Sequence, residues 1–375
     1  MFYVALRILL YDKIRTLITL IGVVFAVSLI FAQLGIYFGL METSSVIIDN
    51  TPSDIWITSQ NSKNFDFSQP FPEYKYFHTL STDGVQWAEK LIVAWALIRQ
   101  KEGGTEQIEI VGFNPDTGVG GPWRMQAGDT KMLKNGDFAI ADASAMKRLG
   151  QIRVGDYRDI FGRRIQIVGI SQGAKSFTTA PILFVSYRLA QKLEGWIGPD
   201  NTVFIIAKVL PGYSVSKVIE NLKEKLQGVD VYSKAAFSKK TRMYWTFETG
   251  VGYAFLITII ISFLVGTLIV GQTIYNSTNE HIKEFGTLKA LGAENMDVYE
   301  IIFTQAFIIA LLSYLISLII TLVSVRLYEA IDMVMVVKWW TNLLVFFITF
   351  LMCFASAYIS IRKIKRIDPA ILFRG

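Results

Sequence analysis

Four stretches of the sequence contain no charged residue and are long enough to cross a lipid bilayer. A helix needs roughly 20 consecutive apolar residues to span the hydrocarbon core. We therefore expect membrane helices at residues 17–41, 249–278, 301–325 and 339–361. This feature constrains the fold more than any other, because a segment in lipid must satisfy its backbone hydrogen bonds within itself.

The composition indicates a membrane protein with a substantial polar domain. The mean hydropathy of +0.40 and a hydrophobic content of 52% are too high for an ordinary soluble protein. The charged content of 18% is too high for a chain that lies entirely in the membrane. The polar residues concentrate in the long segment 42–248, which we expect to fold around its own core. The single cysteine, Cys353, rules out an intramolecular disulfide in that domain.

The basic residues near the spans predict the orientation of the chain. Arg7, Lys13 and Arg15 precede the first span, and the tail 362–375 after the fourth span is basic. Because cytoplasmic flanks are enriched in lysine and arginine, both termini and the loop 279–300 are expected in the cytoplasm. The segment 42–248 and the short loop 326–338 are then outside, in the periplasm of a bacterium with two membranes.

The N-terminal residues are expected to stay with the protein. Residues 1–16 predict a short amphipathic helix at the membrane interface before the first span. The apolar run that follows is too long for a cleavable signal peptide and has no clear small-x-small cleavage site.

The outer segment shows alternating strand and helix patterns, which predict an α+β domain with two lobes. Residues 60–77 and 114–123 are expected to be loops, and residues 233–248 a basic, aromatic helix that runs directly into the second span. An alternative for the charges of 233–248 is a solvated helix end beside an aromatic belt. We expect strands at 54–58, 91–99, 107–113, 202–208 and 229–232, a hairpin over 159–170, and helices at 83–90, 143–149, 186–193 and 214–226.

No pattern in the sequence predicts catalysis or a metal site. The two histidines, His78 and His281, are far apart, and no Cys/His cluster has metal-ligand spacing. There is no Gly-x-Ser-x-Gly elbow, and the nearest approach to a nucleotide-binding P-loop, residues 169–176, lacks the Gly-Lys pair. Any nucleotide chemistry must therefore come from another chain. The net charge of +6 is modest and does not predict nucleic-acid binding.

Small and hydroxyl-bearing residues recur every four positions in the second span, which predicts a face for close helix packing. Whether this face packs within one subunit or across a homodimer is open from the sequence. No charged residue lies in the middle of a span, which argues against a proton relay or a hydrophilic pore. The four residues of this face are Ala254, Thr258, Ser262 and Gly266.

The loop after the second span reads as a short amphipathic helix. Ile282, Phe285 and Leu288 fall at helical spacing on one side, and Gly292 stands where the helix would stop. A helix this short needs a partner surface. Its simplest interpretation is a loop at the membrane surface that links two spans.

The residues of this loop carry more information than that. The pattern Glu-x-x-x-Glu-Phe-Gly-x-Leu-Lys-Ala-Leu-Gly-Ala over residues 280–293 resembles the cytoplasmic signature of MacB/FtsX/LolC-type (type VII) ABC-transporter permeases. The end of the chain, 367–374, resembles the Asp-Pro-x-x-x-Leu-Arg ending of the same family. The order of one span, a large domain and three further spans is also similar. Within the family the chain is most similar to DevC-type permeases.

The resemblance implies a mechanism and a set of partners. Two permease subunits would form a homodimer with two cytoplasmic ABC ATPase subunits, which bind the ATP and magnesium, so that this chain binds no cofactor. ATP hydrolysis would change the posture of the periplasmic domain (mechanotransmission). A lipid, glycolipid or other hydrophobic substrate would pass to a periplasmic adaptor (membrane fusion) protein and an outer-membrane channel. The alternative is an FtsX-like regulator of a periplasmic enzyme or sensor kinase, which transports nothing.

The resemblance also implies which residues contact the ATPase and where the chain resides. Phe285, Leu288 and Leu291 would be the apolar anchors of that contact, and the chain would be a multi-pass protein of the bacterial cytoplasmic (inner) membrane. The ATPase-coupling set comprises Glu280, Lys283, Glu284, Phe285, Gly286, Leu288, Lys289, Ala290, Leu291, Gly292, Ala293, Asp368 and Pro369.

Overall fold

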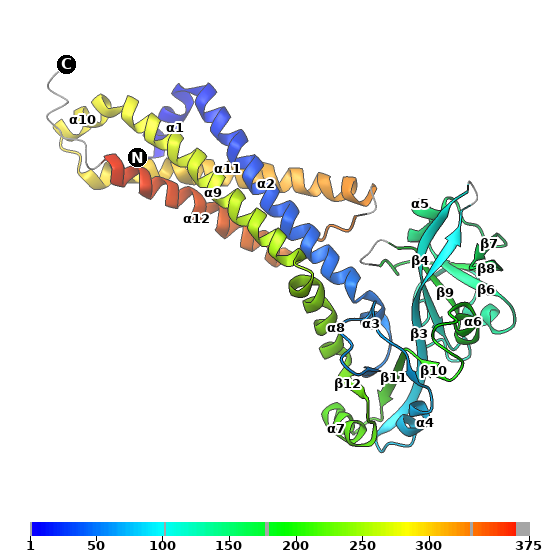
Figure 1. Ribbon diagram of the computed structural model, residues 1–375. Helices are drawn as coiled ribbons and strands as arrows, with labels where there is room; N and C mark the ends of the chain where they lie inside the picture. Colours follow the sequence, from blue (N-terminus) through cyan, green and yellow to red (C-terminus); the bar gives the residue numbers. More distant parts are fainter. Residues whose placement is uncertain (1, 101–102, 177–179, 331–332, 365–375) are drawn as a thin grey trace. The chain divides into compact units, whose positions relative to one another are not determined.

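The structure is a computed structural model that describes residues 2–100, 103–176, 180–330 and 333–364 (Figure 1). It divides into two compact units. The helical unit comprises Met1–Gly39 and Val251–Gly375, and the sheet unit comprises Leu40–Gly250. Each unit is described by itself.

Four long apolar helices dominate the helical unit and confirm the prediction of four membrane helices. Their most apolar windows have mean hydropathies of 2.3 to 2.7. A shorter helix, α1 (Phe2–Tyr11), precedes them and buries Ala5 and Leu9. The long helices extend a few residues past the uncharged stretches, because helical hydrogen bonding continues through the polar residues at their ends. They are α2 (Lys13–Ser44), α9 (Val251–Glu280), α11 (Asn295–Ala330) and α12 (Trp339–Ile364).

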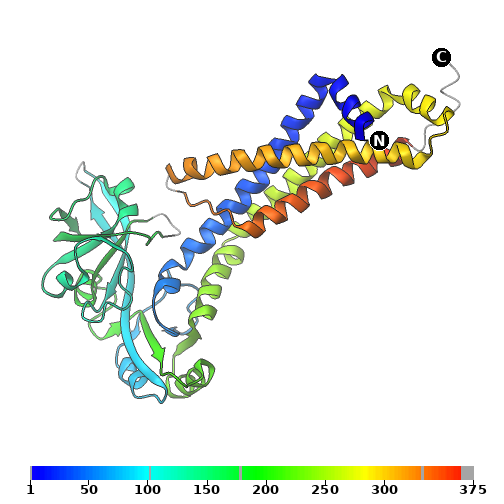
Figure 2. The same ribbon diagram turned by 180° about the vertical axis from the view of Figure 1, so that it is seen from behind.

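Helix α12 packs against both α9 and α11, as the views from either side show (Figures 1 and 2). Hydroxyl groups of α12 bond to backbone carbonyls of α9: Ser356 Oγ donates to Thr267 O at 2.7 Å, and Ser360 Oγ donates to Gly271 O at 3.0 Å. Such bonds require the backbones to approach closely, which small residues permit.

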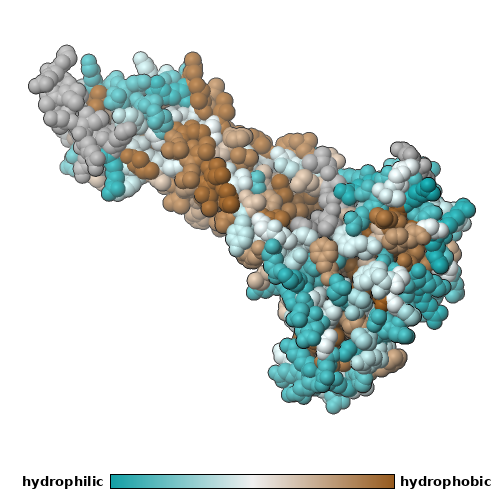
Figure 3. Space-filling view, viewed as in Figure 1, coloured by the Kyte–Doolittle hydropathy of each residue, from teal (hydrophilic) through white to brown (hydrophobic). Residues whose placement is uncertain are grey.

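The surfaces of the two units differ in polarity. Apolar residues form broad patches over the helical unit, whereas polar residues cover most of the visible face of the sheet unit (Figure 3). This distribution matches a bundle that faces lipid and a domain that faces water.

The sheet unit is built on a mixed sheet with the strand order β12-β1-β11-β3-β4-β9-β6-β8-β5, and β7 pairs with both β3 and β8 (Figure 1). β10 (Asn201–Thr202) and β2 (Phe71–Pro72) form a separate short pair. Most neighbours are antiparallel, and β4 with β9 and β6 with β8 are parallel. The strands are β1 (Ile55–Ser59), β3 (Val85–Arg99), β4 (Thr105–Phe113), β5 (Met125–Ala127), β6 (Phe138–Asp142), β7 (Tyr157–Ile160), β8 (Arg163–Ser171), β9 (Ile182–Ser186), β11 (Phe204–Val209) and β12 (Val229–Ser233).

Short helices complete the sheet unit and confirm its α+β class. Several begin at the caps that the sequence provides: Ser186 and Ser233 each accept a hydrogen bond from a backbone N–H of the first turn. The helices are α3 (Val46–Asn50), α4 (Lys75–Leu80), α5 (Met146–Leu149), α6 (Tyr187–Leu193), α7 (Val215–Lys225) and α8 (Lys234–Met243), with 3-10 turns η1 (Thr130–Lys134) and η2 (Ala143–Ala145) and the π-helix η3 (Tyr244–Glu248).

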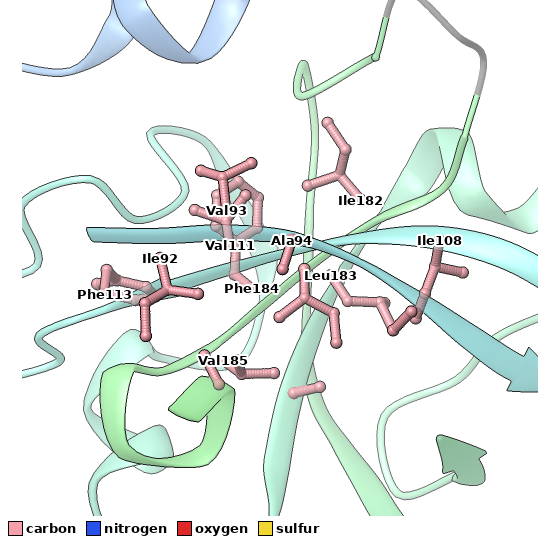
Figure 4. Packing of buried hydrophobic residues seen from close by; sticks show 14 of the residues in the cluster. Ile92, Val93, Ala94, Ile108, Val111, Phe113, Ile182, Leu183, Phe184 and Val185 are labelled. Carbon is pink, nitrogen blue, oxygen red and sulfur yellow. The ribbon is translucent and has the colours of Figure 1, made fainter. Parts of the chain in front are cut away.

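Two hydrophobic cores lie along this sheet, in agreement with the predicted two lobes. The larger core gathers side chains of β3, β4 and β9, such as Ile92, Val111 and Phe184 (Figure 4). The smaller core gathers Ile57, Ile205 and Leu222 from β1, β11 and α7. The long strand β3 contributes to both, with Ala88 in the smaller core and residues such as Leu91 and Ile98 in the larger one.

Several expected elements are present and three are wrong. The hairpin of β3 and β4 turns at Gly103 and Gly104, which have the positive φ angles that favour glycine, and β7 and β8 form the expected second hairpin. The helix expected at 83–90 is wrong, because β3 already begins at Val85 and pairs with β11 there. Burial of Ala88 against the sheet outweighs the local helical pattern.

The other two corrections concern connecting segments. Residues 60–77 are not wholly a loop, since β2 lies within them and α4 begins at Lys75. Residues 233–248 do not run into the second span as one continuous helix. The regular helix α8 ends at Met243, a π-helix follows, and Gly250 with a φ of +78° interrupts the helix before Val251. A left-handed residue cannot continue an α-helix.

Candidate functional site

The predicted coupling segment folds as helix α10 (Ile282–Ala290), which stands between two membrane helices. Only His281 separates it from α9, and residues 291–294 lead into α11. Phe285 is 6% exposed and belongs to the apolar core of the helical unit, and Leu288 packs against the same core. Lys283, Glu284 and Thr287 are exposed. Two of the three expected apolar anchors therefore fasten α10 to its own chain, and its polar side faces outward.

The third apolar residue, Leu291, has a different environment. Its side chain is 81% exposed at the turn that follows α10. Gly292 ends the helix with a φ of +99°, and the N–H of Ala293 donates to the carbonyl of Leu288 at 3.0 Å. An open hollow of about 540 Å³ follows, lined by Ala293, Glu294, Asn295 and Met296. The side chain of Leu291 is therefore accessible from outside the chain.

Glu280 is held within its own chain. Its two carboxylate oxygens accept hydrogen bonds from both terminal nitrogens of Arg15, at 2.5 and 2.8 Å. Arg15 lies near the start of α2 and also contacts Asp12 at 3.3 Å. This bidentate pair ties the start of the first span to the end of the second. Sequence reasoning missed Arg15, because the partners are 265 residues apart and nothing in either local pattern marks them.

Helix α1 lies beside α10. The rings of Tyr11 and His281 meet edge to face at 5.6 Å, and His281 Nδ1 lies 3.5 Å from the carboxylate of Glu284. A groove of about 380 Å³ between the two helices is lined partly by Tyr3 and Arg7. The N-terminal helix therefore forms part of the same surface as the coupling segment.

The remaining predicted coupling residues can be placed only in part. Gly286 lies half-buried in the middle of α10. Lys289 and Ala290 belong to the last turn of α10, and their side chains lie outside the described set. Asp368 and Pro369 lie outside the described residues altogether.

The predicted packing face of the second span divides into two halves. Ser262 and Gly266 are buried within the helical unit. A Cβ atom at Gly266 would lie 2.2 Å from the sulfur of Met352 on α12 and 3.2 Å from Ala26 on α2. Ala254 is exposed and Thr258 is half-buried. The inner half therefore packs within one chain, and the outer half leaves an apolar surface that includes Leu256, Ile257 and Ile260.

The sheet unit contains buried carboxyl groups that the sequence did not single out. Asp66 accepts hydrogen bonds from Trp245 Nε1 at 3.0 Å and from Asn64 Nδ2 at 3.2 Å. Burial raises the pKa of Asp66 and of Glu109, and the charge of Asp66 raises the pKa of Glu109 further. Among the described residues, no group of three His, Cys, Asp or Glu side chains is placed to hold a metal ion. We therefore assign these carboxyl groups to the internal structure of the unit.

The segment that returns from the sheet unit toward the second span is fastened at several points. Arg242 donates to Asp49 at 2.6 Å and to Ser45 at 2.8 Å, and Lys63 lies 2.8 Å from Glu248. The π-helix η3 is held by the bond from Trp245 to Asp66. π-helices are rare in proteins and often occur at functional sites.

Comparison with known proteins gives a consistent family. A family model for the MacB-like periplasmic core domain matches residues 16–225, and one for the FtsX-like permease C-terminal region matches residues 209–369. Two uncharacterized ABC transporter permeases of Mycobacterium tuberculosis are each 24% identical to this chain, over the full length of both proteins. An uncharacterized ABC transporter permease of Methanocaldococcus jannaschii is 27% identical over 60% of this chain and 58% of its own length.

Solved structures of isolated domains also resemble part of the chain. The periplasmic region of MacB from Actinobacillus actinomycetemcomitans is 11% identical and aligns with a TM-score of 0.41 over 52% of this chain and 96% of its own. The extracellular domain of the transporter YknZ from Gram-positive bacteria is 13% identical, with a TM-score of 0.37 over 48% of this chain and 98% of its own.

Proposed function

Because this chain belongs to the ABC transporter permeases that combine a MacB-like periplasmic core domain with an FtsX-like C-terminal region, we propose that it couples ATP hydrolysis by a separate ATPase to movement of its sheet unit. Two copies would pair with two ATPase subunits at the cytoplasmic (inner) membrane, with both termini in the cytoplasm. The chain itself would bind neither ATP nor magnesium.

Helix α10 is the observation that supports this proposal most directly. Phe285 packs in the core of the helical unit. A displacement of α10 would therefore move the membrane helices that pack around Phe285. Its exposed side offers Lys283, Glu284 and Thr287, and Leu291 adds an apolar contact at the end. A ligand shifts a conformational equilibrium only through different contacts with the two states. The ATP-bound ATPase must therefore hold α10 differently from the ATPase without ATP.

The membrane helices suggest how the substrate is handled. Their long apolar stretches contain no charged residue, and buried hydroxyl groups such as Thr349 and Ser356 bond to backbone carbonyls. These groups do not indicate a hydrophilic path for the substrate through one subunit. We propose that a lipid, glycolipid or other hydrophobic molecule is handled outside the membrane or at its outer leaflet, and passes to a periplasmic adaptor and an outer-membrane channel.

The coupling is tested at Thr287, an exposed position in the middle of α10. The full chain is reconstituted in lipid vesicles with the ATPase subunit encoded beside it, and ATP hydrolysis is measured with and without the neighbouring adaptor. Thr287→Pro removes a backbone donor and breaks the helix, at a cost of about 3 kcal/mol. We expect it to abolish the adaptor-stimulated rate, whereas the control Thr287→Ala retains it.

Two outcomes would contradict the proposal in different ways. If the adaptor stimulates the Thr287→Pro and Thr287→Ala variants equally, an intact α10 is not needed for coupling. A complex that hydrolyses ATP but ignores the adaptor would contradict export and favour a regulator that transports nothing.

A further inference from the structure

An open groove of about 610 Å³ lies in the sheet unit, between the return segment (α8 and η3) and the loop at Asn61. Three lysines line it together with three large side chains that are apolar or aromatic. The lysines are Lys63, Lys239 and Lys240, and the large side chains are Met243, Tyr244 and Phe247.

The charge of the groove suits an anion. Lys239 is exposed, and Lys63 pairs with Glu248 only at the surface, where both side chains are more than half exposed and the pair is weak. Lys240 donates to the hydroxyl of Tyr232 at 2.6 Å, and its ammonium lies 4.6 Å from the centre of that ring. Three ammonium groups therefore line a groove that contains one carboxylate, that of Glu248.

A further carboxylate, that of Asp230, bonds to the same tyrosine hydroxyl as Lys240. Asp230 accepts hydrogen bonds from the Tyr232 hydroxyl at 3.1 Å and from the backbone N–H of Asn61 at 3.0 Å. It does not line the groove. The lining of the groove therefore has an excess of positive charge.

Apolar side chains lie beside these lysines in the same groove. Met243 is 47% exposed and Phe247 is 53% exposed, and they are four residues apart, which places them on one side of the return segment. Phe247 precedes Val251, the first residue of the membrane helix α9, by four positions. Free phosphate or another small soluble anion could bind the lysines but would make no contact with these apolar side chains. An amphiphile with an acidic head would contact both the lysines and the apolar side chains.

We propose that this groove binds an acidic lipid from the outer leaflet, with its phosphate at Lys63 and Lys239 and its apolar part against Met243 and Phe247. Basic residues beside a bilayer attract anionic headgroups, and exposed aromatic side chains favour the interface. The inference rests on the proposed extracytoplasmic placement of the sheet unit and is independent of coupling to an ATPase. It gives the return segment a lipid-sensing surface next to the second span.

The test uses the full chain in nanodiscs and photoreactive phospholipids that differ only in the headgroup. Phosphatidylglycerol and phosphatidylcholine, each with the same diazirine-bearing acyl chain, are cross-linked, and peptides covering residues 236–248 are quantified by mass spectrometry. Since each lysine near a membrane surface strengthens binding about fivefold, we expect the acidic lipid to label this segment at least about fivefold more than the zwitterionic lipid.

Variants identify the residues that hold the headgroup. Lys63→Glu combined with Lys239→Glu should remove the preference for the acidic lipid. The matched control, Lys131→Glu combined with Lys223→Glu, changes two exposed lysines of the same unit outside the groove and should retain it. Phe247→Ser should lower labelling by the acidic lipid without changing the protein's charge.

Three results would overturn the proposal. They are equal labelling by the two lipids, an equal loss in the groove and control variants, and displacement of the acidic lipid by excess glycerol phosphate, which would mark a site for free anions. None of these measurements needs ATP. Failure of the lipid site is thus distinguishable from failure of the ATPase coupling.

Discussion

The helical unit and the sheet unit differ in the kinds of polar side chain that they bury. Among the described residues, the buried polar side chains of the helical unit are hydroxyl groups and Gln305, and the Arg15–Glu280 pair lies at helix ends. The sheet unit buries hydroxyl groups as well, but it also buries carboxyl groups, including Asp66, Glu109 and Asp142. An ionisable group within lipid lacks both water and a fixed partner network, whereas a sheet domain can supply backbone donors.

This difference indicates how each unit can respond to its surroundings. The helical unit depends on close packing and on charges at its ends, so it responds to contacts with other proteins or lipids. Burial raises the pKa of carboxyl groups in the sheet unit, so we expect its stability to depend on pH. Three substitutions test the comparison, and the largest effect is expected from packing.

Gly266→Leu is expected to destabilise the helical unit by about 3 kcal/mol, because a side chain there collides with Met352. Thermal unfolding of the purified chain in detergent measures the loss. Ala254→Leu, on the exposed half of the same helix, is the matched control and should leave the unfolding temperature unchanged. An equal loss in both variants would show that the two halves of the packing face do not differ.

Glu109→Gln is expected to change the pH dependence of the sheet unit. Burial raises the pKa of Glu109 to about 8, so the folded unit holds a proton that the unfolded chain releases. Its stability therefore falls as the pH rises from the ordinary glutamate range toward that value. The variant should be more stable than the native chain above that pH and nearly equal to it at acidic pH.

The pH effect is measured by chemical unfolding of the full chain, followed by tryptophan fluorescence across the pH range. Glu224→Gln, an exposed change on α7, is the control and should reproduce the native profile. A Glu109→Gln profile that keeps the native slope would show that the carboxyl group is not a buried acid.

Charge reversal at Arg15 is expected to have the smallest effect on stability, since the pair lies at the surface. Arg15→Glu places two carboxylates together and should loosen the junction between the end of α9 and the start of α2. Adding Glu280→Arg should restore the native unfolding temperature, because the pair is re-formed with its ends exchanged. A double variant no better than the single one would show that the ion pair does not hold this junction.

The sequence predicted best where a local pattern decides the structure. The uncharged stretches defined the four membrane helices, and the glycine pair at 103–104 marked the hairpin of β3 and β4. The helix expected at 83–90 failed because pairing with β11, more than 100 residues away, decides that segment. The interruption at Gly250 was missed, since a glycine inside an apolar pattern does not by itself reveal a positive φ.

For the candidate site, too, the sequence predicted the local helix but not the contacts between distant segments. The amphipathic pattern predicted the helix α10, but not that Phe285 packs in the core of its own chain. The pairs Arg15–Glu280 and Trp245–Asp66 join segments far apart in sequence, and a single sequence holds no record of such pairings. They depend on how the units fold, which local spacing does not encode.

The contact between α10 and an ATPase is the central claim, and cysteine cross-linking tests it most directly. The native Cys353 is buried, so a cysteine introduced at Leu291 is the accessible thiol of the coupling segment. We predict that Leu291→Cys cross-links to the co-reconstituted ATPase with a yield that changes between ATP and ADP. Leu268→Cys, an exposed position on α9, should not cross-link. No cross-link from residue 291, or equal yields from both positions in either nucleotide state, would contradict the account.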